Sequence, residues 1–319
     1  MSRPVLISVV SPVYGCTACL KPLSEAVCSA FAGTGLDWEL VLVDDRGPGD
    51  PWPVISRLAA GDARIRGVRL ARNHGQHLAI WAGLAEARGD WVCVVDCDLQ
   101  DDPGIIPRLL EQARADAADA VVVDRGTWSD SWFRRAASSA LYRLIGALGG
   151  VRIGNVGNFG LYSRRMVDTL LLYREQEVFL PMMISLTGLK RTTLQADRSG
   201  RAAGQSSYSL MRLARLAMAI IVRFSDRPLK LSVVIGLAFS VISAAISLLL
   251  VIAWAAGEFT VPGWTSTVLS VWFLSGLIMA TLGVHGFYLG RVFAEVKMRP
   301  RVVVETTTAQ ESPGRADAG

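Results

Sequence analysis

Charged residues are scarce in this 319-residue sequence, at 19% against 51% hydrophobic, and they are missing altogether from two long stretches. Neither Leu231–Gly257 nor Phe259–Gly290 contains Asp, Glu, Lys or Arg. Each stretch exceeds the ~20 apolar residues that cross a bilayer core, and core helices of soluble proteins rarely run so long without a polar face. These absences argue against an ordinary soluble protein and predict two transmembrane helices, over 231–257 and 265–290.

Lys and Arg are also absent from the loop between the two stretches, whereas they flank the outer ends, at Arg223, Arg227, Lys230, Arg291, Lys297, Arg299 and Arg301. Basic residues favour the cytoplasmic side. We therefore expect a multi-pass protein of the inner membrane with residues 1–200 and the tail, 291–319, in the cytoplasm. Val5–Val13 is too short and too strand-like for a secretory signal. The end of the tail, Thr306–Gly319, has no apolar periodicity and is expected to be disordered.

Cysteine and histidine are few, with five and three residues. Cys16 and Cys19 form a C-x-x-C without a second pair at zinc spacing, so we interpret them as packing residues. A cytoplasmic domain predicts that all five thiols are reduced. For His74 and His77, capping or packing is favoured over catalysis.

Short β-rich runs alternate with helical patterns in the first 200 residues, which indicates a doubly wound α/β sheet. The predicted strands are VLISVV, WELVLV, IRGVRL, WVCVVD and AVVV, and the helices lie around 21–31, 53–58, 77–88 and 107–114. Neither a G-x-G-x-x-G fingerprint nor a Walker sequence occurs. If the domain binds phosphates, something other than a glycine-rich loop must hold them.

Polar residues follow three of these strands, where ligands bind in open α/β sheets. They are Pro12 and Tyr14 after the first strand, Asp44 and Asp45 after the second, and Asp96 and Asp98 after the fourth. Two carboxylates two residues apart suit one Mg²⁺ or Mn²⁺ that bridges diphosphate oxygens, and the cation offsets their repulsion. For Asp101 and Asp102 a second interpretation stays open, in which they cap the helix at Pro103.

Several motifs in this order resemble the family 2 glycosyltransferases that act on polyprenyl phosphate. They are SVVSPVYG, LVLVDDRGPGD, RNHGQHLAIWAGLAEARGDWVCVVDCDLQDDP, NFGLYSRR, GQSSYS and, after the two apolar stretches, LGRVFAEVKMRPR. The resemblance implies a GT-A (Rossmann-like) domain that binds a nucleotide-sugar, with UDP as the expected carrier. It also implies that the protein is an inverting enzyme whose product is a polyprenyl-phosphate-linked sugar for cell-envelope glycans.

The resemblance also implies roles for individual residues. Asp44 would contact the base or ribose with Asp45 beside it, and Pro12 and Tyr14 would belong to the same donor site. Asp96 and Asp98 would coordinate the metal and the donor diphosphate, and Gln100 and Asp101 would line the sugar side. Members of the family often form oligomers, so a homotetramer is a possible assembly.

A basic segment before the first apolar stretch suggests where an anionic acceptor binds. Between Lys190 and Lys230 the chain has nine Lys or Arg against two Asp, although its net charge is only +5. Residues 201–230 are expected to form an acceptor loop and an amphipathic interfacial helix that contacts membrane lipid. The loop residues predicted to bind a lipid phosphate are Arg198, Arg201, Ser206 and Tyr208.

Two other functions are weighed against this prediction, and nucleic acid is not among the expected partners. A polysaccharide synthase of the same superfamily would require a Q-x-x-R-W stretch, which is absent. A non-catalytic scaffold or lipid-binding subunit with a degenerate transferase domain would not need Asp96, Asp98 and Arg201, all of which are present.

Overall fold

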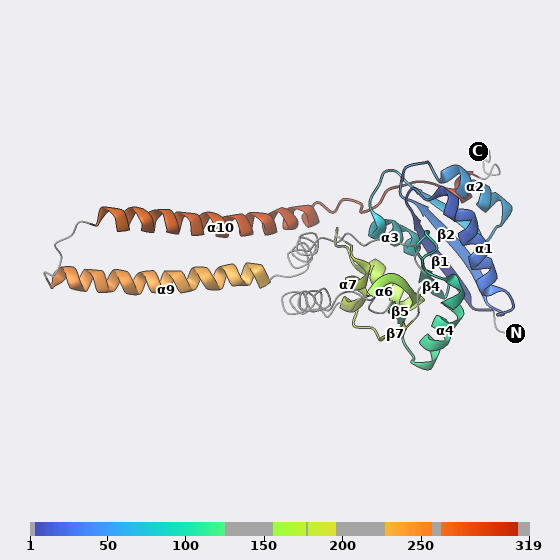
Figure 1. Ribbon diagram of the computed structural model, residues 1–319, viewed down its shortest axis with the longest axis horizontal. Coiled ribbons are helices and arrows are strands. Elements are labelled where there is room, and N and C mark those ends of the chain that lie inside the picture. The colour runs from blue at the N-terminus through green and yellow to red at the C-terminus, as the bar shows by residue number, and fades with distance from the viewer. Residues whose placement is uncertain (1–3, 125–155, 177, 196–226, 257–262, 312–319) are drawn as a thin grey trace, which may run out of the picture. The chain divides into compact units, whose positions relative to one another are not determined.

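The computed structural model describes residues 4–124, 156–176, 178–195, 227–256 and 263–311. The chain divides into two units, and each is treated by itself. Unit 1 contains a sheet with helices on both faces (Figure 1). Its strands are β1 (Leu6–Val13), β2 (Asp37–Asp44), β3 (Ile65–Leu70), β4 (Trp91–Val94), β5 (Ala120–Asp124), β6 (Val156–Ser163), β7 (Arg191–Gln195) and β8 (Val304–Thr307).

Two layers of helices bury the apolar faces of this sheet. Leu23 and Leu109 belong to the core on one face, and Ile80 and Leu170 belong to the core on the other. Strand β1 contributes Val9 to the first core and Val10 to the second, as expected for a central strand buried on both sides. The helices in the described part of unit 1 are α1 (Leu20–Phe31), α2 (Trp52–Gly61), α3 (Gln76–Glu86), α4 (Ile106–Ala115), α6 (Arg164–Leu172), α7 (Leu180–Leu186) and α11 (Thr308–Glu311), with short 3-10 turns η1 (Thr17–Cys19) and η2 (Pro103–Ile105).

The sheet is mixed, with strand order β7-β5-β6-β4-β1-β2-β3-β8. Strand β1 lies between β2 and β4 and is parallel to both, which confirms the predicted α/β class. Strands β6 and β8 run antiparallel to their neighbours, so the sheet departs from a uniformly parallel arrangement. The parallel centre places the ends of β1, β2 and β4 at one edge, where the predicted polar residues follow.

The prediction of a disordered end from Thr306 onward is wrong for residues up to Glu311. Strand β8 pairs antiparallel with the edge of β3 and leads into α11. The hydroxyl of Thr308 accepts a hydrogen bond from the Gly67 N–H at 3.0 Å. Because β3 otherwise offers an unpaired edge, pairing with it holds this segment as a strand.

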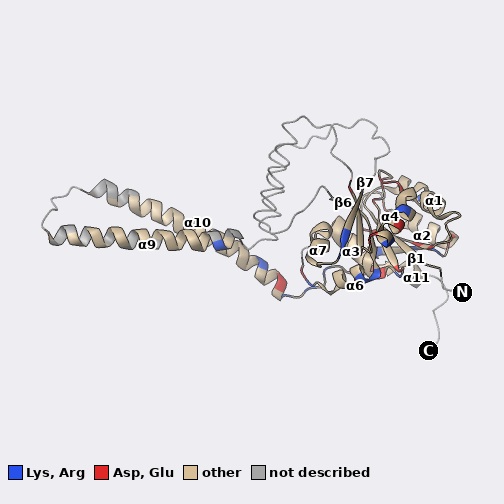
Figure 2. Ribbon diagram, turned by 90° about the horizontal axis from the view of Figure 1, so that it is seen from below, with Lys and Arg blue, Asp and Glu red and all other residues tan. Residues whose placement is uncertain are grey.

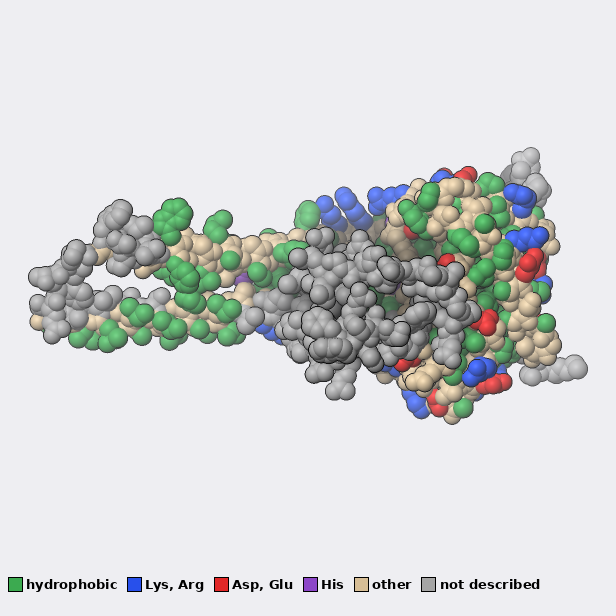
Figure 3. Space-filling model, in the orientation of Figure 1, with side chains coloured by type: hydrophobic (Ala, Val, Ile, Leu, Met, Phe, Trp, Pro, Cys, Tyr) green, Lys and Arg blue, Asp and Glu red, His purple; other side chains and the backbone are tan. Residues whose placement is uncertain are grey.

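Unit 2 contains two long helices, α9 (Arg227–Ala255) and α10 (Trp264–Val296), which lie side by side and run in opposite directions (Figure 1). The rings of Phe239 in α9 and Phe273 in α10 contact each other at a tilt of 41°, with centroids 6.1 Å apart. The charged residues of α9 and α10 lie at one end of each helix (Figure 2). Apolar side chains are exposed along both helices (Figure 3).

Helices α9 and α10 overlap the two stretches predicted as spans, 231–257 and 265–290. Among the described residues, one helical segment, Ser270–Val296 in α10, is long and apolar enough to cross a bilayer. The side chains of Trp272 and Phe273 within it are 77% and 63% exposed, so unit 2 itself leaves this apolar surface uncovered.

Candidate active site

A cavity of about 530 Å³ lies at the carboxyl edge of the central strands. This volume is in the usual range for small-molecule sites. The walls come from the ends of β1, β2 and β4 and from the start of α3. They include Pro12, Tyr14, Asp45, Gln76, Asp96 and Asp98. The structure therefore brings together most of the residues predicted for the donor site.

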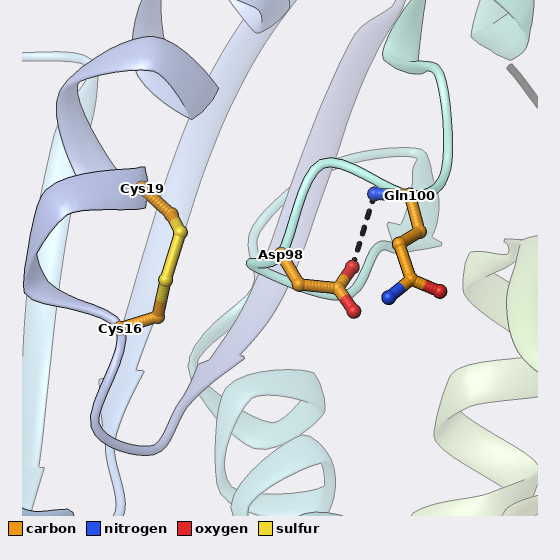
Figure 4. The surroundings of a disulfide bond; sticks show 4 residues. All are labelled: Cys16, Cys19, Asp98 and Gln100. Atoms are coloured by element: carbon orange, nitrogen blue, oxygen red, sulfur yellow. Dashed lines mark hydrogen bonds between the residues drawn. A yellow bond between two sulfur atoms is a disulfide. The ribbon is translucent and has the colours of Figure 1, made fainter. Parts of the chain in front are cut away.

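The two acids that follow β4 both face this cavity, and each carboxylate has a hydrogen-bond donor. Gln76 Nε2 donates to Asp96 Oδ1 at 2.6 Å. The backbone N–H of Gln100 donates to Asp98 Oδ1 at 3.0 Å (Figure 4). Leu99, between Asp98 and Gln100, has a left-handed φ of 58° that reverses the chain. The turn directs two carboxylates to one space, a donor set that suits a hard divalent cation.

The acids farther along this loop have different surroundings. Asp102 is the N-cap of η2, where its Oδ1 accepts a hydrogen bond from the Gly104 N–H at 2.8 Å. This confirms the capping interpretation for Asp102. Asp101 is 4% exposed, and neither Asp101 nor Gln100 is among the residues that line this cavity.

The adjacent acids at the end of β2 point to different partners. Asp44 is fully buried, accepts a hydrogen bond from the Arg46 N–H at 2.9 Å and pairs with Arg69 at 3.3 Å. Asp45 lines the cavity and accepts hydrogen bonds from the N–H groups of His74 and Gly75, at 2.7 and 2.8 Å. Burial raises the pKa of the Asp45 carboxyl, although these two bonds oppose the shift. Asp45 is thus the member of the pair at the cavity wall.

His77 packs instead of facing the cavity, as predicted. Its ring lies edge-on to Phe179, with centroids 4.9 Å apart. Burial lowers the pKa of His77 to about 4. Within the described part of the chain its Nδ1 is buried with no hydrogen-bond partner. At neutral pH the imidazole of His77 is therefore uncharged in the folded protein.

Acidification should destabilise the protein through this histidine. Between about pH 6.5 and 4 the unfolded state takes up a proton on His77 that the folded state does not, so stability falls as the pH falls. We expect His77→Phe to remove about 2 kcal/mol of the loss between pH 7.5 and pH 5. Denaturant unfolding of both proteins at the two pH values measures this, and an identical acid loss in the variant would contradict it.

Cys16 and Cys19 form a disulfide in the structure, so the expectation of five reduced thiols is wrong for this pair (Figure 4). The short turn η1 brings their Cα atoms to 5.5 Å, within the range that a disulfide can bridge. Cys16 also lines the cavity. The other three cysteines, Cys28, Cys93 and Cys97, are free thiols.

The residues predicted to bind the acceptor phosphate are not among those that the structure describes. Arg198, Arg201, Ser206 and Tyr208 lie outside the described residues. No group of three or more His, Cys, Asp or Glu that could hold a metal occurs in the described ranges.

Gln76 is a cavity residue that sequence reasoning missed. Its position in the sequence could have indicated this role. Gln76 begins the helix that follows β3, at the same edge of the sheet as Asp45 and Asp96.

Known proteins similar to this chain include a protein family, relatives matched over nearly the whole chain and a solved structure. The family model "Glycosyl transferase family 2" matches residues 8–171. The undecaprenyl-phosphate 4-deoxy-4-formamido-L-arabinose transferase of Aeromonas hydrophila is 33% identical, covering 98% of this chain and 97% of the relative. The uncharacterized glycosyltransferase YkcC of Bacillus subtilis is 28% identical with the same coverage. A solved mannosyltransferase from Pyrobaculum calidifontis, in complex with GDP-Man and Mn²⁺, is 14% identical, with 92% of this chain and 88% of that chain covered and a TM-score of 0.48.

Proposed function

Because this chain belongs to glycosyl transferase family 2, we propose that it transfers a sugar from a nucleotide-sugar, UDP-linked, to polyprenyl phosphate. One observation carries the donor half of the proposal: Asp45, Asp96 and Asp98 come from two strand ends and line one cavity. Relatives that share nearly the whole chain and are named undecaprenyl-phosphate transferases support the acceptor half. The product would be a polyprenyl-phosphate-linked sugar for the cell envelope.

The donor site follows from the cavity walls. Asp96 and Asp98 would hold Mg²⁺ or Mn²⁺, because both carboxylates face the same cavity. When bound, the cation stabilises the negative charge on the leaving nucleoside diphosphate. Asp45, with Asp44 behind it, would contact the nucleoside near Pro12 and Tyr14. Gln100 would lie on the sugar side, with Asp101 supporting the loop.

The proposal for the acceptor site rests on the basic loop in the sequence and on the two apolar helices of unit 2. Arg198, Arg201, Ser206 and Tyr208 would grip the lipid phosphate beside an interfacial helix within 201–230. Helices α9 and α10 would form two spans, with the catalytic domain and both chain ends on the cytoplasmic side. The apolar side chains exposed along α9 and α10 support a lipid environment for both helices.

The reaction needs little from a protein base. A phosphate monoester has a second pKa of about 6, so an acceptor oxygen is already anionic at neutral pH. That oxygen attacks the anomeric carbon as the bond from this carbon to the donor diphosphate breaks, and one displacement inverts the configuration. The protein's share is to align the two phosphates across the sugar, which lowers the entropic barrier.

Arg201 should serve the acceptor and not the donor. We expect Arg201→Ala to lower kcat/KM for polyprenyl phosphate by roughly ten- to a hundredfold, because one charge-assisted pair is lost. Arg201→Lys should recover part of this, since an ammonium keeps the charge without the bidentate fork. Calorimetry with the donor alone should show nearly native affinity. Arg114→Ala, on the exposed end of α4, is the matched control.

Collapse of donor affinity in Arg201→Ala, with acceptor dependence unchanged, would assign the loop to the diphosphate instead.

The proposed function is tested with the full-length protein in detergent or nanodiscs. A panel of nucleotide-sugars is offered with undecaprenyl phosphate and Mn²⁺, and the lipid product is identified by mass spectrometry. We expect a single sugar on the lipid and release of nucleoside diphosphate that requires the metal. A scaffold or lipid-binding subunit would give no product, and a polysaccharide synthase would give a growing chain.

A further inference from the structure

Gln76 connects two walls of the cavity. It is the first residue of α3, and its side-chain amide reaches the end of β4, where Nε2 donates to Asp96 Oδ1 at 2.6 Å. The opposite amide orientation would place two oxygens against each other, so the donating group must face the carboxylate. A short bond to an ionised acceptor is stronger than a neutral one.

The loop before Gln76 is itself fixed from the end of β2. Both oxygens of Asp45 accept backbone N–H groups, from His74 and Gly75. Gly75, the N-cap of α3, has a φ of 89°, which L side chains rarely adopt. Asp45 thus holds the backbone that carries Gln76, and Gln76 holds Asp96. The three residues link the nucleoside end of the cavity to its diphosphate end.

The chemistry of an amide suits this position. Its N–H donates to Asp96 Oδ1 and fixes the direction of that carboxylate at the cavity wall. Because the amide is uncharged, it orients the carboxylate without neutralising its charge. Groups that orient metal-binding carboxylates typically change metal affinity by about 10- to 100-fold.

We propose that Gln76 is a positioning residue that orients Asp96 for the divalent cation of the donor complex. The inference rests on the proposed function, since it assumes that Asp96 binds the metal. Gln76 acts through Asp96 and does not contact the reacting atoms.

The test compares Gln76→Met with Gln112→Met in the full-length protein. Methionine matches glutamine in size and cannot donate. Gln112 makes a similar bond, to Asp116 Oδ2 at 2.7 Å on α4, but is not a cavity residue. Mn²⁺ affinity is measured by electron paramagnetic resonance with UDP present and acceptor absent, and transfer is measured at limiting and saturating Mn²⁺. We expect Gln76→Met to bind Mn²⁺ about tenfold more weakly, with transfer largely recovered at saturating metal, and Gln112→Met to be native.

Mn²⁺ affinity of Gln76→Met within twofold of native would overturn the positioning role, as would an equal loss in Gln112→Met. Neither result would affect the transfer reaction of the native protein. Conversely, Gln76→Met could bind Mn²⁺ tenfold more weakly while the native protein forms no lipid-linked sugar. That pair of results would support the positioning role and reject the proposed function.

Discussion

Asp98→Asn, and likewise Asp96→Asn, is expected to lower transfer by on the order of a thousandfold while the protein stays folded. Asparagine nearly preserves the volume but removes the charge that binds a divalent cation. The hydrogen bond from the Gln100 N–H to Asp98 Oδ1 can persist with an amide oxygen, so the turn should survive. Product formation with the lipid acceptor and Mn²⁺ affinity with UDP are measured together, and both should be lost.

Asp102→Asn is the matched control for this loop. Asp102 caps η2 through the Gly104 N–H, and asparagine caps about as well as aspartate. Native activity is therefore expected from the control. Transfer by Asp96→Asn and Asp98→Asn that survives metal chelation would remove the basis for a metal site here.

Ending the chain after Val303 should destabilise unit 1 by about 3 to 5 kcal/mol, which is roughly two to four orders of magnitude in the unfolding equilibrium. The cut removes the pairing of β8 with β3 and the bond between the Gly67 N–H and Thr308. It also removes Glu305, which pairs with Arg46 and lies 3.6 Å from Arg69, the partner of Asp44. Denaturant unfolding followed by tryptophan fluorescence measures the change in the free energy of unfolding.

A chain that ends after Glu311 provides the control, since it keeps β8, α11 and every contact just named. Its stability should equal that of the full chain. Equal stability of the Val303 and Glu311 truncations would show that β8 contributes nothing to the domain.

The central strands were predictable from sequence because burial on both faces produces continuous apolar runs, as in β1, β2 and β5. Strands β7 and β8 gave no such signal. In β7 (RTTLQ) exposed and partly buried residues alternate, and β8 (VETT) is polar. Both lie at the edges of the sheet, where pairing with a neighbour decides the conformation more than local preference does.

The site was predictable to the level of strand ends but not of side-chain direction. Adjacent residues of a strand point to opposite faces, and spacing alone could not show that Asp45, and not Asp44, reaches the cavity. The contact between Gln76 and Asp96 joins residues 20 apart, and it depends on how α3 docks. The pairing of Cys16 with Cys19 depends on the local turn η1, which the apolar pattern does not reveal.

Strand β8 sets an order of events during synthesis. Unit 1 is discontinuous in sequence: its last segment begins at Pro300, after both long helices. A ribosome therefore makes α9 and α10 before β8 exists, and the edge of β3 stays unpaired throughout that interval. An unpaired edge is open to mispairing with other chains. Unit 1 therefore completes its sheet only after both apolar helices have been synthesised.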